Sequence, residues 1–182
     1  MFRHFIVRNV NVCAVLALHC HIKDTTMHTA DDALRLDRQL CFALHAASMA
    51  MTKAYKPHLE VLGLTYPQYL VLLVLWEHDD LTVSDIGERL QLDSGTLTPL
   101  LKRLEAAGCL SRLRDADDER RVRVQLTKAG RQMRRKVQDI PVCMLATTGL
   151  TLGEAGRLTA KLHALRQHLG GGSAAQRRRG TD

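Results

Sequence analysis

Hydrophobic positions along the chain recur mostly at the spacing of α-helices. From 33 to 55 they return every three or four residues, which predicts an amphipathic helix that ends before Pro57. Thr65 and Gln68 form a capping box around a proline, and they begin a second helix whose body, 69–76, is almost entirely apolar. A helix that is apolar on all sides has to be buried, so we expect this one in the core.

The next segment predicts two short helices in succession. Thr82 and Asp85 form another capping box in front of a helix over 83–90. A basic amphipathic helix follows and ends at Gly108, because glycine takes the left-handed position after a helix without strain. Pro99 favours a late start for this helix, since proline is tolerated in the first turn. Three polar residues could cap it: Asp93, Ser94 and Thr96.

Two short strands then enclose a charged turn. The strands are predicted over 110–114 and 122–126, and the turn between them is acidic first and basic afterwards. Two helices followed by such a hairpin are the elements of a winged helix–turn–helix, in which the second helix enters a major groove and the wing reaches the neighbouring backbone. The sequence therefore predicts binding of double-stranded DNA.

Two further helices are predicted after the strands. Thr127 caps a long basic helix that extends toward Leu150, and Thr151 caps a last helix that ends at the glycine run 170–172. The first and last helices carry apolar surface with no partner in a simple winged domain, and dimerisation would bury it. We therefore predict a mainly α fold with a small β-wing: a winged helix–turn–helix core flanked by N- and C-terminal dimerisation helices. Such a homodimer matches a palindromic operator.

The two ends of the chain differ in composition from the rest. Residues 1–30 mix basic and apolar residues, without the apolar centre and cleavage site of a signal peptide and without the length to span a bilayer. We interpret them as an N-terminal extension, disordered or absent if translation begins at Met27. Residues 31–170 form the predicted winged domain, and 171–182 a disordered basic tail.

The candidate DNA-binding residues lie on the second short helix and in the wing. The beginning of the helix, which approaches base edges, carries short polar side chains, and basic residues follow one to two turns later. In the wing we expect Asp118 to orient an arginine pair, so that one guanidinium enters the minor groove; a solvated charged hairpin is the alternative. The predicted residues are Ser94, Thr96, Thr98, Lys102, Arg103, Asp118, Arg120 and Arg121.

Composition narrows the choice of partner. The net charge of +7 fits nucleic acid or an anionic membrane, and an aromatic content of only 4% argues against binding single strands or RNA by base stacking. Five cysteines at irregular spacing, without a CxxC pair, argue against a disulfide framework or a zinc site. We therefore expect a reduced, cytoplasmic protein with no metal, no cofactor and no membrane partner.

Several motifs together resemble one family of regulators. The run 117–130 is similar to the wing signature of the multiple-antibiotic-resistance regulator (MarR) family. Five further segments resemble one branch of that family, the organic hydroperoxide resistance regulators (OhrR), and the resemblance extends roughly over 34–168. These segments are 36–44, 51–57, 64–69, 75–78 and 92–103.

The resemblance changes the interpretation of Cys41. By its position alone, a cysteine on an amphipathic helix is more often a small core residue than a sensor. In the similar regulators, however, the matching thiol senses peroxide and is held by two tyrosine hydroxyls, which correspond here to Tyr55 and Tyr66. A thiolate attacks a peroxide oxygen and becomes a sulfenic acid. His45 stands where many relatives carry a further tyrosine, and it either supports the thiolate or fills the pocket.

A second cysteine has a possible redox role implied by the same resemblance. Relatives with two sensing cysteines carry the second after an apolar residue and a proline, and here Ile140-Pro141 precedes Cys143. The relatives place that thiol about one turn later. If Cys143 resolves the sulfenic acid, the disulfide joins it to Cys41 of the other subunit. Cys109 is expected in the core.

The predicted function is that of a dimeric transcriptional repressor, not an enzyme. It senses organic hydroperoxides by oxidation of Cys41 and then releases its operator. One alternative is a MarR-type repressor released by a small phenolic or lipophilic ligand, with Cys41 as a bystander. An alternative of another class is a thiol peroxidase that uses Cys41, although the sequence has no CxxC reductant site.

Overall fold

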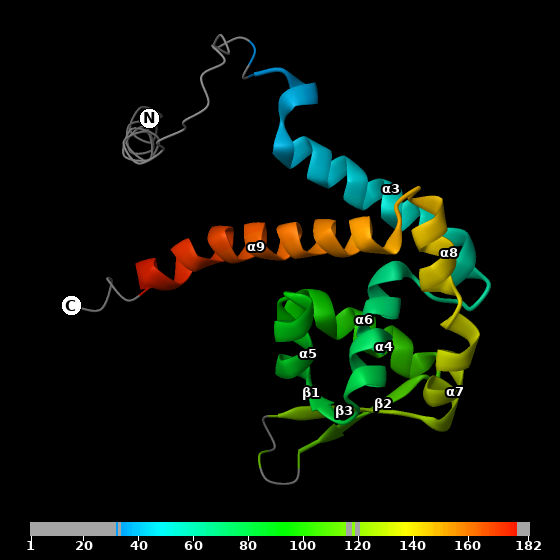
Figure 1. Cartoon of the computed structure of the whole chain (residues 1–182). Coiled ribbons are helices and arrows are strands. Elements are labelled where there is room, and N and C mark those ends of the chain that lie inside the picture. The colour runs from blue at the N-terminus through cyan, green and yellow to red at the C-terminus, as the bar shows by residue number, and fades with distance from the viewer. Residues whose placement is uncertain (1–31, 33, 116–117, 119–120, 178–182) are drawn as a thin grey trace, which may run out of the picture. The chain divides into compact units, whose positions relative to one another are not determined.

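The computed structural model describes most of the chain (Figure 1). It describes all residues except 1–31, 33, 116–117, 119–120 and 178–182. The chain divides into two units, Met1–Ala47 and Ser48–Asp182. The N-terminal extension predicted over 1–30 lies outside the described residues.

The described part of the first unit contains a short turn and the beginning of a helix. The turn η1 (Leu36–Arg38) is a 3₁₀ helix, and α3 begins at Leu40. The prediction of one continuous helix from 33 was therefore wrong. Arg38 forms an ion pair with Asp32, and Arg35 and Gln39 on either side of the turn have extended backbone conformations, so the α-helix starts only after them.

Helix α3 (Leu40–Glu60) passes through the proline that was predicted to end it. The ring of Pro57 removes the amide that would bond to the carbonyl of Lys53, and both residues are exposed, so water can bond to that carbonyl instead. The turn after the proline is held in place because the side chain of Leu59 is completely buried. Tertiary packing thus outweighs the local cost of the proline.

The central helix of the second unit is α4 (Tyr66–Glu77), as predicted. The capping box is present, with the backbone amide of Thr65 donating to Oε1 of Gln68 at 2.8 Å. Its apolar body is buried, which confirms the prediction for this segment. The buried core around it consists of Leu59, Leu64, Tyr69, Val71, Leu72, Val74, Leu75, Ile86, Leu97, Leu101, Leu104, Cys109, Leu110, Val124, Leu126, Val137, Ile140 and Met144.

The two short helices of the predicted helix–turn–helix are present as α5 (Val83–Leu90) and α6 (Ser94–Ala106). Of the three candidate caps of α6, it is Asp93 that caps the helix, and its carboxylate accepts from the amide of Thr96 at 2.8 Å, so the late start that Pro99 favoured does not occur. Pro99 therefore lies inside the helix, on its exposed side, where the carbonyl it leaves unbonded can be solvated. Gly108 follows the helix with φ +70°, the left-handed conformation predicted for the glycine that ends this helix.

A small antiparallel sheet of three strands follows, in the order β1-β3-β2. Strands β2 (Leu110–Arg114) and β3 (Val122–Leu126) form the predicted hairpin, with Leu110 opposite Leu126. The pairing of β1 (Leu81–Thr82) with β3 was not predicted, because a two-residue strand leaves no periodic pattern. At the tip the amide of Asp115 donates to the carbonyl of Arg121 at 2.9 Å.

The long helix predicted over 128–150 is divided into α7 (Lys128–Val137) and α8 (Ile140–Thr147). The cause is Pro141, which has no amide to continue the ladder of α7 but fits the first turn of a new helix. Gly130 allows α7 to approach the sheet closely, since a β-carbon there would lie 1.9 Å from the carbonyl oxygen of Cys109. The position therefore requires glycine.

The last helix, α9 (Leu152–Arg177), continues through the glycine run that was predicted to end it. Glycine lowers helix stability by about 1 kcal/mol relative to alanine but does not forbid the conformation. The described glycines with positive φ are Gly63, Gly108 and Gly149, and Gly170 is not among them. Among the described helices, none is long and apolar enough to cross a membrane.

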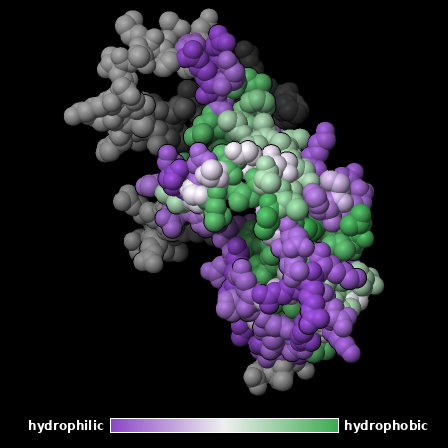
Figure 2. Space-filling model, turned by 45° about the vertical axis from the view of Figure 1, so that its right-hand side comes forward, coloured by the Kyte–Doolittle hydropathy of each residue, from purple (hydrophilic) through white to green (hydrophobic). Residues whose placement is uncertain are grey.

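The helices outside the winged core expose apolar side chains. Figure 2 shows hydrophobic side chains gathered at the surface over these helices, whereas the face of the winged core seen in this view is largely hydrophilic. On α9 the residues Leu158, Leu162 and Leu169 remain 48%, 39% and 73% exposed. Val142 of α8 is 70% exposed. Apolar area of this kind indicates a surface that another molecule covers.

Candidate nucleic-acid interface and thiol site

Helix α6 is fixed by its buried side and presents a polar, basic side outward. Leu97, Leu101 and Leu104 are almost completely buried against the core. Lys102 and Arg103 are exposed one to two turns from the helix start. A helix anchored in this way can offer its outer side chains to a groove without moving its backbone.

The polar residues at the start of α6 have different roles. Ser94 is exposed and Thr98 is half-buried. The hydroxyl of Thr96 donates to Oδ2 of Asp93 at 2.9 Å. Bonds from the backbone and side chain of Thr96 lower the pKa of Asp93, so the cap stays charged. Thr96 therefore fixes the first turn of the helix in this structure.

The wing brings Asp118 and Arg121 into one tight turn. The amide of Arg121 donates to the carbonyl of Asp118 at 2.9 Å, and both side chains are exposed. The pKa of Asp85 in α5 is lowered mainly by hydrogen bonds from Thr82. The nearby charges of Arg121 and Arg123 lower it further. Arg120 lies outside the described residues, so the orientation of an arginine pair by Asp118 stays a prediction.

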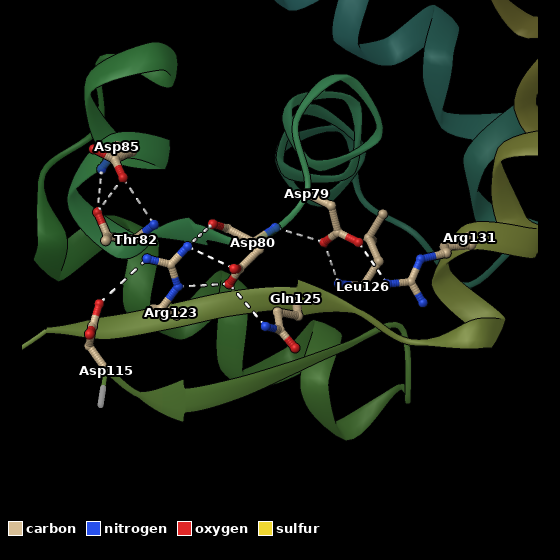
Figure 3. Close-up of polar contacts among 9 residues, drawn as sticks. All are labelled: Asp79, Asp80, Thr82, Asp85, Asp115, Arg123, Gln125, Leu126 and Arg131. Atoms are coloured by element: carbon tan, nitrogen blue, oxygen red, sulfur yellow. Dashed lines mark hydrogen bonds and ion pairs between the residues drawn. The ribbon is translucent and has the colours of Figure 1, made fainter. Parts of the chain in front are cut away.

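The base of the wing holds an ion-pair network that sequence reasoning missed (Figure 3). Arg123 of β3 donates from Nε to Oδ1 of Asp80 at 2.8 Å and from Nη2 to Oδ2 at 2.7 Å. The same Nη2 also reaches the backbone oxygen of Asp80 at 2.6 Å. Two further residues complete the group. Nη1 of Arg123 also donates to Oδ2 of Asp115 at 3.5 Å, and Nε2 of Gln125 donates to Oδ1 of Asp80 at 3.0 Å.

The residue before this aspartate makes a second set of bonds to the same region. Asp79 accepts from the amide of Leu126 at 2.8 Å and from Nη2 of Arg131 at 2.8 Å. Leu126 ends β3 and Arg131 belongs to α7. The loop after α4 therefore holds both the second strand of the wing and the helix that follows it.

The other strand of the wing is tied to α6. Arg112 of β2 donates to the carboxylate of Glu105 through its backbone amide at 3.1 Å and through its guanidinium at 2.9 and 2.6 Å. These bonds lower the pKa of Glu105. The wing is therefore connected by ion pairs to α6 and to the loop that follows α4.

The three described cysteines are free thiols in different environments. Cys41 and Cys143 are exposed, and Cys109 is buried, which confirms its predicted place in the core. Burial raises the pKa of the Cys109 thiol, so this cysteine is poorly suited to form a nucleophilic thiolate. No group of three or more potential metal ligands occurs among the residues that the structure describes.

The two tyrosines expected at the thiol, Tyr55 and Tyr66, lie side by side. The ring centroids of Tyr55 and Tyr66 are 4.8 Å apart, and Tyr69 lies 5.8 Å from Tyr55. Desolvation raises the pKa of all three hydroxyls, so they remain protonated and able to donate hydrogen bonds. Cys41 and His45, both exposed, belong to the first unit, and the predicted contact of Cys41 with the tyrosines stays a prediction.

Comparison with known proteins places the chain among transcriptional regulators. The family model of the SarA/Rot transcriptional regulators matches residues 53–140. The organic hydroperoxide resistance transcriptional regulator of Bacillus subtilis is 47% identical over 143 residues, which cover 79% of this chain and 97% of the relative. The HTH-type transcriptional regulator TtmR of Methylorubrum extorquens is 52% identical over 139 residues, 76% of this chain and 71% of the relative.

The chain belongs to the MarR family of transcriptional regulators, in its organic hydroperoxide resistance branch. The predicted family and fold class are thereby confirmed, since solved relatives share the winged helix fold. Reduced AbfR bound to DNA superposes with a TM-score of 0.65 at 36% identity, covering 78% of this chain and 99% of that one. AbfR, a protein of Staphylococcus epidermidis, is also known in overoxidised and disulfide forms.

The residues missed at the wing base had a weak signal in the sequence. Within β3 the apolar residues Val122, Val124 and Leu126 alternate with Arg123 and Gln125. This alternation shows that Arg123 and Gln125 share the polar face of the strand. It cannot show which carboxylate they meet, because the partner is far away along the chain.

Proposed function

We propose that this regulator is a dimeric repressor that binds double-stranded DNA through α6 and the wing and releases it when an organic hydroperoxide oxidises Cys41. The observation that carries the redox part is the pair of adjacent, protonated tyrosine hydroxyls of Tyr55 and Tyr66, together with a free, exposed thiol at Cys41. The relative from Bacillus subtilis, named for organic hydroperoxide resistance, supports the same chemistry.

The DNA part rests on charge and on the exposed side of α6. Lys102 and Arg103 project from a helix whose opposite side is buried, and the chain has a net charge of +7. The relative AbfR has been solved on DNA in its reduced form. The proposed contact residues are Ser94, Thr96, Thr98, Lys102, Arg103, Asp118, Arg120 and Arg121.

The dimer rests on the apolar stripe of α9. Alternating steps of three and four residues separate its members, which is the spacing at which helices pack along a common seam. A second copy of the chain would cover the exposed leucines, and a two-fold dimer fits an operator with two half-sites. The stripe consists of Ala155, Leu158, Leu162, Leu165 and Leu169.

The spacing of the sensing residues favours a thiol site shared between subunits. Cys41 and Tyr55 both belong to α3, nearly four turns apart, and an α-helix rises 1.5 Å per residue, so roughly 20 Å of helix separates them. A hydroxyl cannot donate to a sulfur over that distance. We therefore propose that Cys41 of one subunit is paired with Tyr55 and Tyr66 of the other.

The proposed reaction consumes one peroxide for each thiol. The thiolate of Cys41 attacks the outer oxygen of the hydroperoxide, the O–O bond breaks, and the alkoxide leaves and takes up a proton as the alcohol. The cysteine becomes a sulfenic acid. The two hydroxyl donors favour the ionised thiol because they hydrogen-bond to the charged form. The oxygen added to the sulfur of Cys41 disturbs the hydrogen bonds from the two tyrosine hydroxyls. The loss of these bonds drives release of DNA.

The experiment that tests the proposal is an operator titration with and without peroxide. A double-stranded fragment, selected by the protein from a random pool, is titrated by fluorescence anisotropy before and after cumene hydroperoxide, and intact mass is measured in parallel. We expect tight binding by the reduced protein and release that coincides with a gain of one oxygen or with disulfide formation. Release without a mass change would favour control by a bound ligand. Catalytic consumption of peroxide would favour a thiol peroxidase.

The fate of the sulfenic acid at Cys41 depends on whether Cys143 reacts with it. We propose that it resolves the sulfenic acid of Cys41 in the other subunit, because it is a free, exposed thiol near the start of α8. Cys143→Ser should then abolish the covalent dimer on non-reducing gels and lead to overoxidised Cys41 under prolonged peroxide. A covalent dimer that persists in the variant would exclude Cys143 as the resolving thiol. Oxidation products with the same masses as those of the wild type would show that an external thiol, and not Cys143, completes the reaction.

A further inference from the structure

Helix α4 joins two regions with different proposed roles. Its first residue, Tyr66, is one of the tyrosines proposed at the thiol site. Beyond its last residue, Glu77, the chain reaches Asp79 and Asp80, which hold the base of the wing. All of these residues belong to the same unit, and the aspartates lie directly between the end of α4 and β1 (Figure 3).

The backbone conformation of Asp80 favours its contact with Arg123. Its φ of 60° is left-handed, a conformation that aspartate and asparagine adopt more readily than most residues. This turn presents both the carboxylate and the carbonyl oxygen of Asp80 to one guanidinium, that of Arg123. Three bonds to one planar group fix its orientation as well as its distance.

A short ladder also attaches the wing at this edge. Strand β1 pairs with β3 over only two residues, Leu81 with Val124 and Thr82 with Arg123. Arg123 thus takes part in the ladder through its backbone and in the ion pair through its side chain. Because β3 leads directly out of the charged turn, a change of its orientation at Arg123 is transmitted to the tip of the wing.

We propose that Asp80 and Arg123 are positioning residues for operator binding: their ion pair sets the angle at which the wing meets the DNA. Neither residue needs to touch DNA for this role. The inference rests on the proposed DNA-binding function and extends it to residues outside the interface. It also makes α4 the rigid connection between the proposed thiol site and the wing.

Substitution Asp80→Asn tests the proposal with little disturbance of the backbone, because asparagine also tolerates a left-handed φ. The variant should bind the selected operator about fivefold to tenfold more weakly than the wild type, as expected for a displaced groove contact. Hydroxyl-radical footprinting should show lost protection at the minor-groove flanks that the wing covers. Protection of the central major groove by α6 should remain.

A matched control is available at the end of the same helix. Glu77 forms an exposed ion pair with Arg89 at 3.6 Å, and that pair does not involve the wing. Glu77→Gln should leave affinity within about twofold, as is usual for an exposed pair, and leave the footprint unchanged. Arg123→Lys keeps the charge but loses the planar fork, so it should give a smaller loss of the same flank protection. It also replaces Asp80→Asn as the test if that variant does not fold.

The outcomes separate this inference from the function on which it rests. Wild-type protein that binds no DNA would overturn both. Wild-type binding with an unchanged affinity and footprint for Asp80→Asn would overturn the positioning role alone. A parallel loss of flank and central protection, with a lower melting temperature, would also overturn it, because that pattern indicates general destabilisation.

Discussion

Replacement Cys41→Ser should leave operator binding by the reduced protein at its wild-type level and abolish release by organic hydroperoxide. The hydroxyl has nearly the shape of the thiol, but it does not form a thiolate and cannot be oxidised to a sulfenic acid. Cys41 is exposed, so the substitution creates no cavity. Fluorescence anisotropy with increasing cumene hydroperoxide measures the effect, and intact mass should show no added oxygen at residue 41.

Cys143→Ser is the control for this experiment. It removes another exposed thiol and should keep the first oxidation, so it should still leave DNA when peroxide is added. If Cys41→Ser is released at the wild-type peroxide dose, the thiol mechanism is wrong. A repressor controlled by a small ligand would then be the better account.

Replacement Arg103→Ala should strongly weaken specific operator binding without unfolding the protein. Arg103 is exposed on α6, opposite the buried leucines, so the loss falls on the DNA contact and not on the core. A lost groove contact costs about 1–3 kcal/mol, which corresponds to roughly 5-fold to 150-fold in affinity. Titrations of the selected operator and of a scrambled fragment at one salt concentration measure the change.

The control for this variant removes the same charge elsewhere. Arg134 is exposed on α7, and Arg134→Ala should weaken binding to both fragments slightly and equally, through the general field of the protein. An unchanged ratio of the two affinities in Arg103→Ala would exclude this arginine from specific recognition. Equal losses in both variants would show that only net charge matters.

Local chemistry was sufficient to predict many of the elements. The capping boxes at Thr65 and Thr82 and the stop at Gly108 act through bonds and dihedral angles within a few residues, so the sequence contains all that is needed. The strands 110–114 and 122–126 were predicted to the residue, because their alternation is interrupted by a charged turn. The same reasoning identified α6 and the exposed Lys102 and Arg103.

Prolines and glycines were the main source of error, because their effect depends on surroundings that the sequence does not show. Pro57 did not end α3, since the next turn is anchored by the buried Leu59. Pro141 did begin a new helix, where a continuous one was predicted. Gly108 stops a helix and Gly170 does not, although the residue type is the same. For the prolines, the outcome follows from the solvation and packing of the neighbouring turn.

The sequence by itself determined the winged helix–turn–helix and its basic outer surface, because these depend on periodicity and capping, and its motifs suggested the cysteine and tyrosines that we propose for sensing. Only the tertiary structure decided what holds the wing in place. Asp80 meets Arg123, and Trp76 donates to the carbonyl of Gly130 at 3.0 Å, across separations of 43 and 54 residues. Periodicity tells which face of an element a residue occupies, but a pair so distant in the chain is chosen only when the helices and strands pack together.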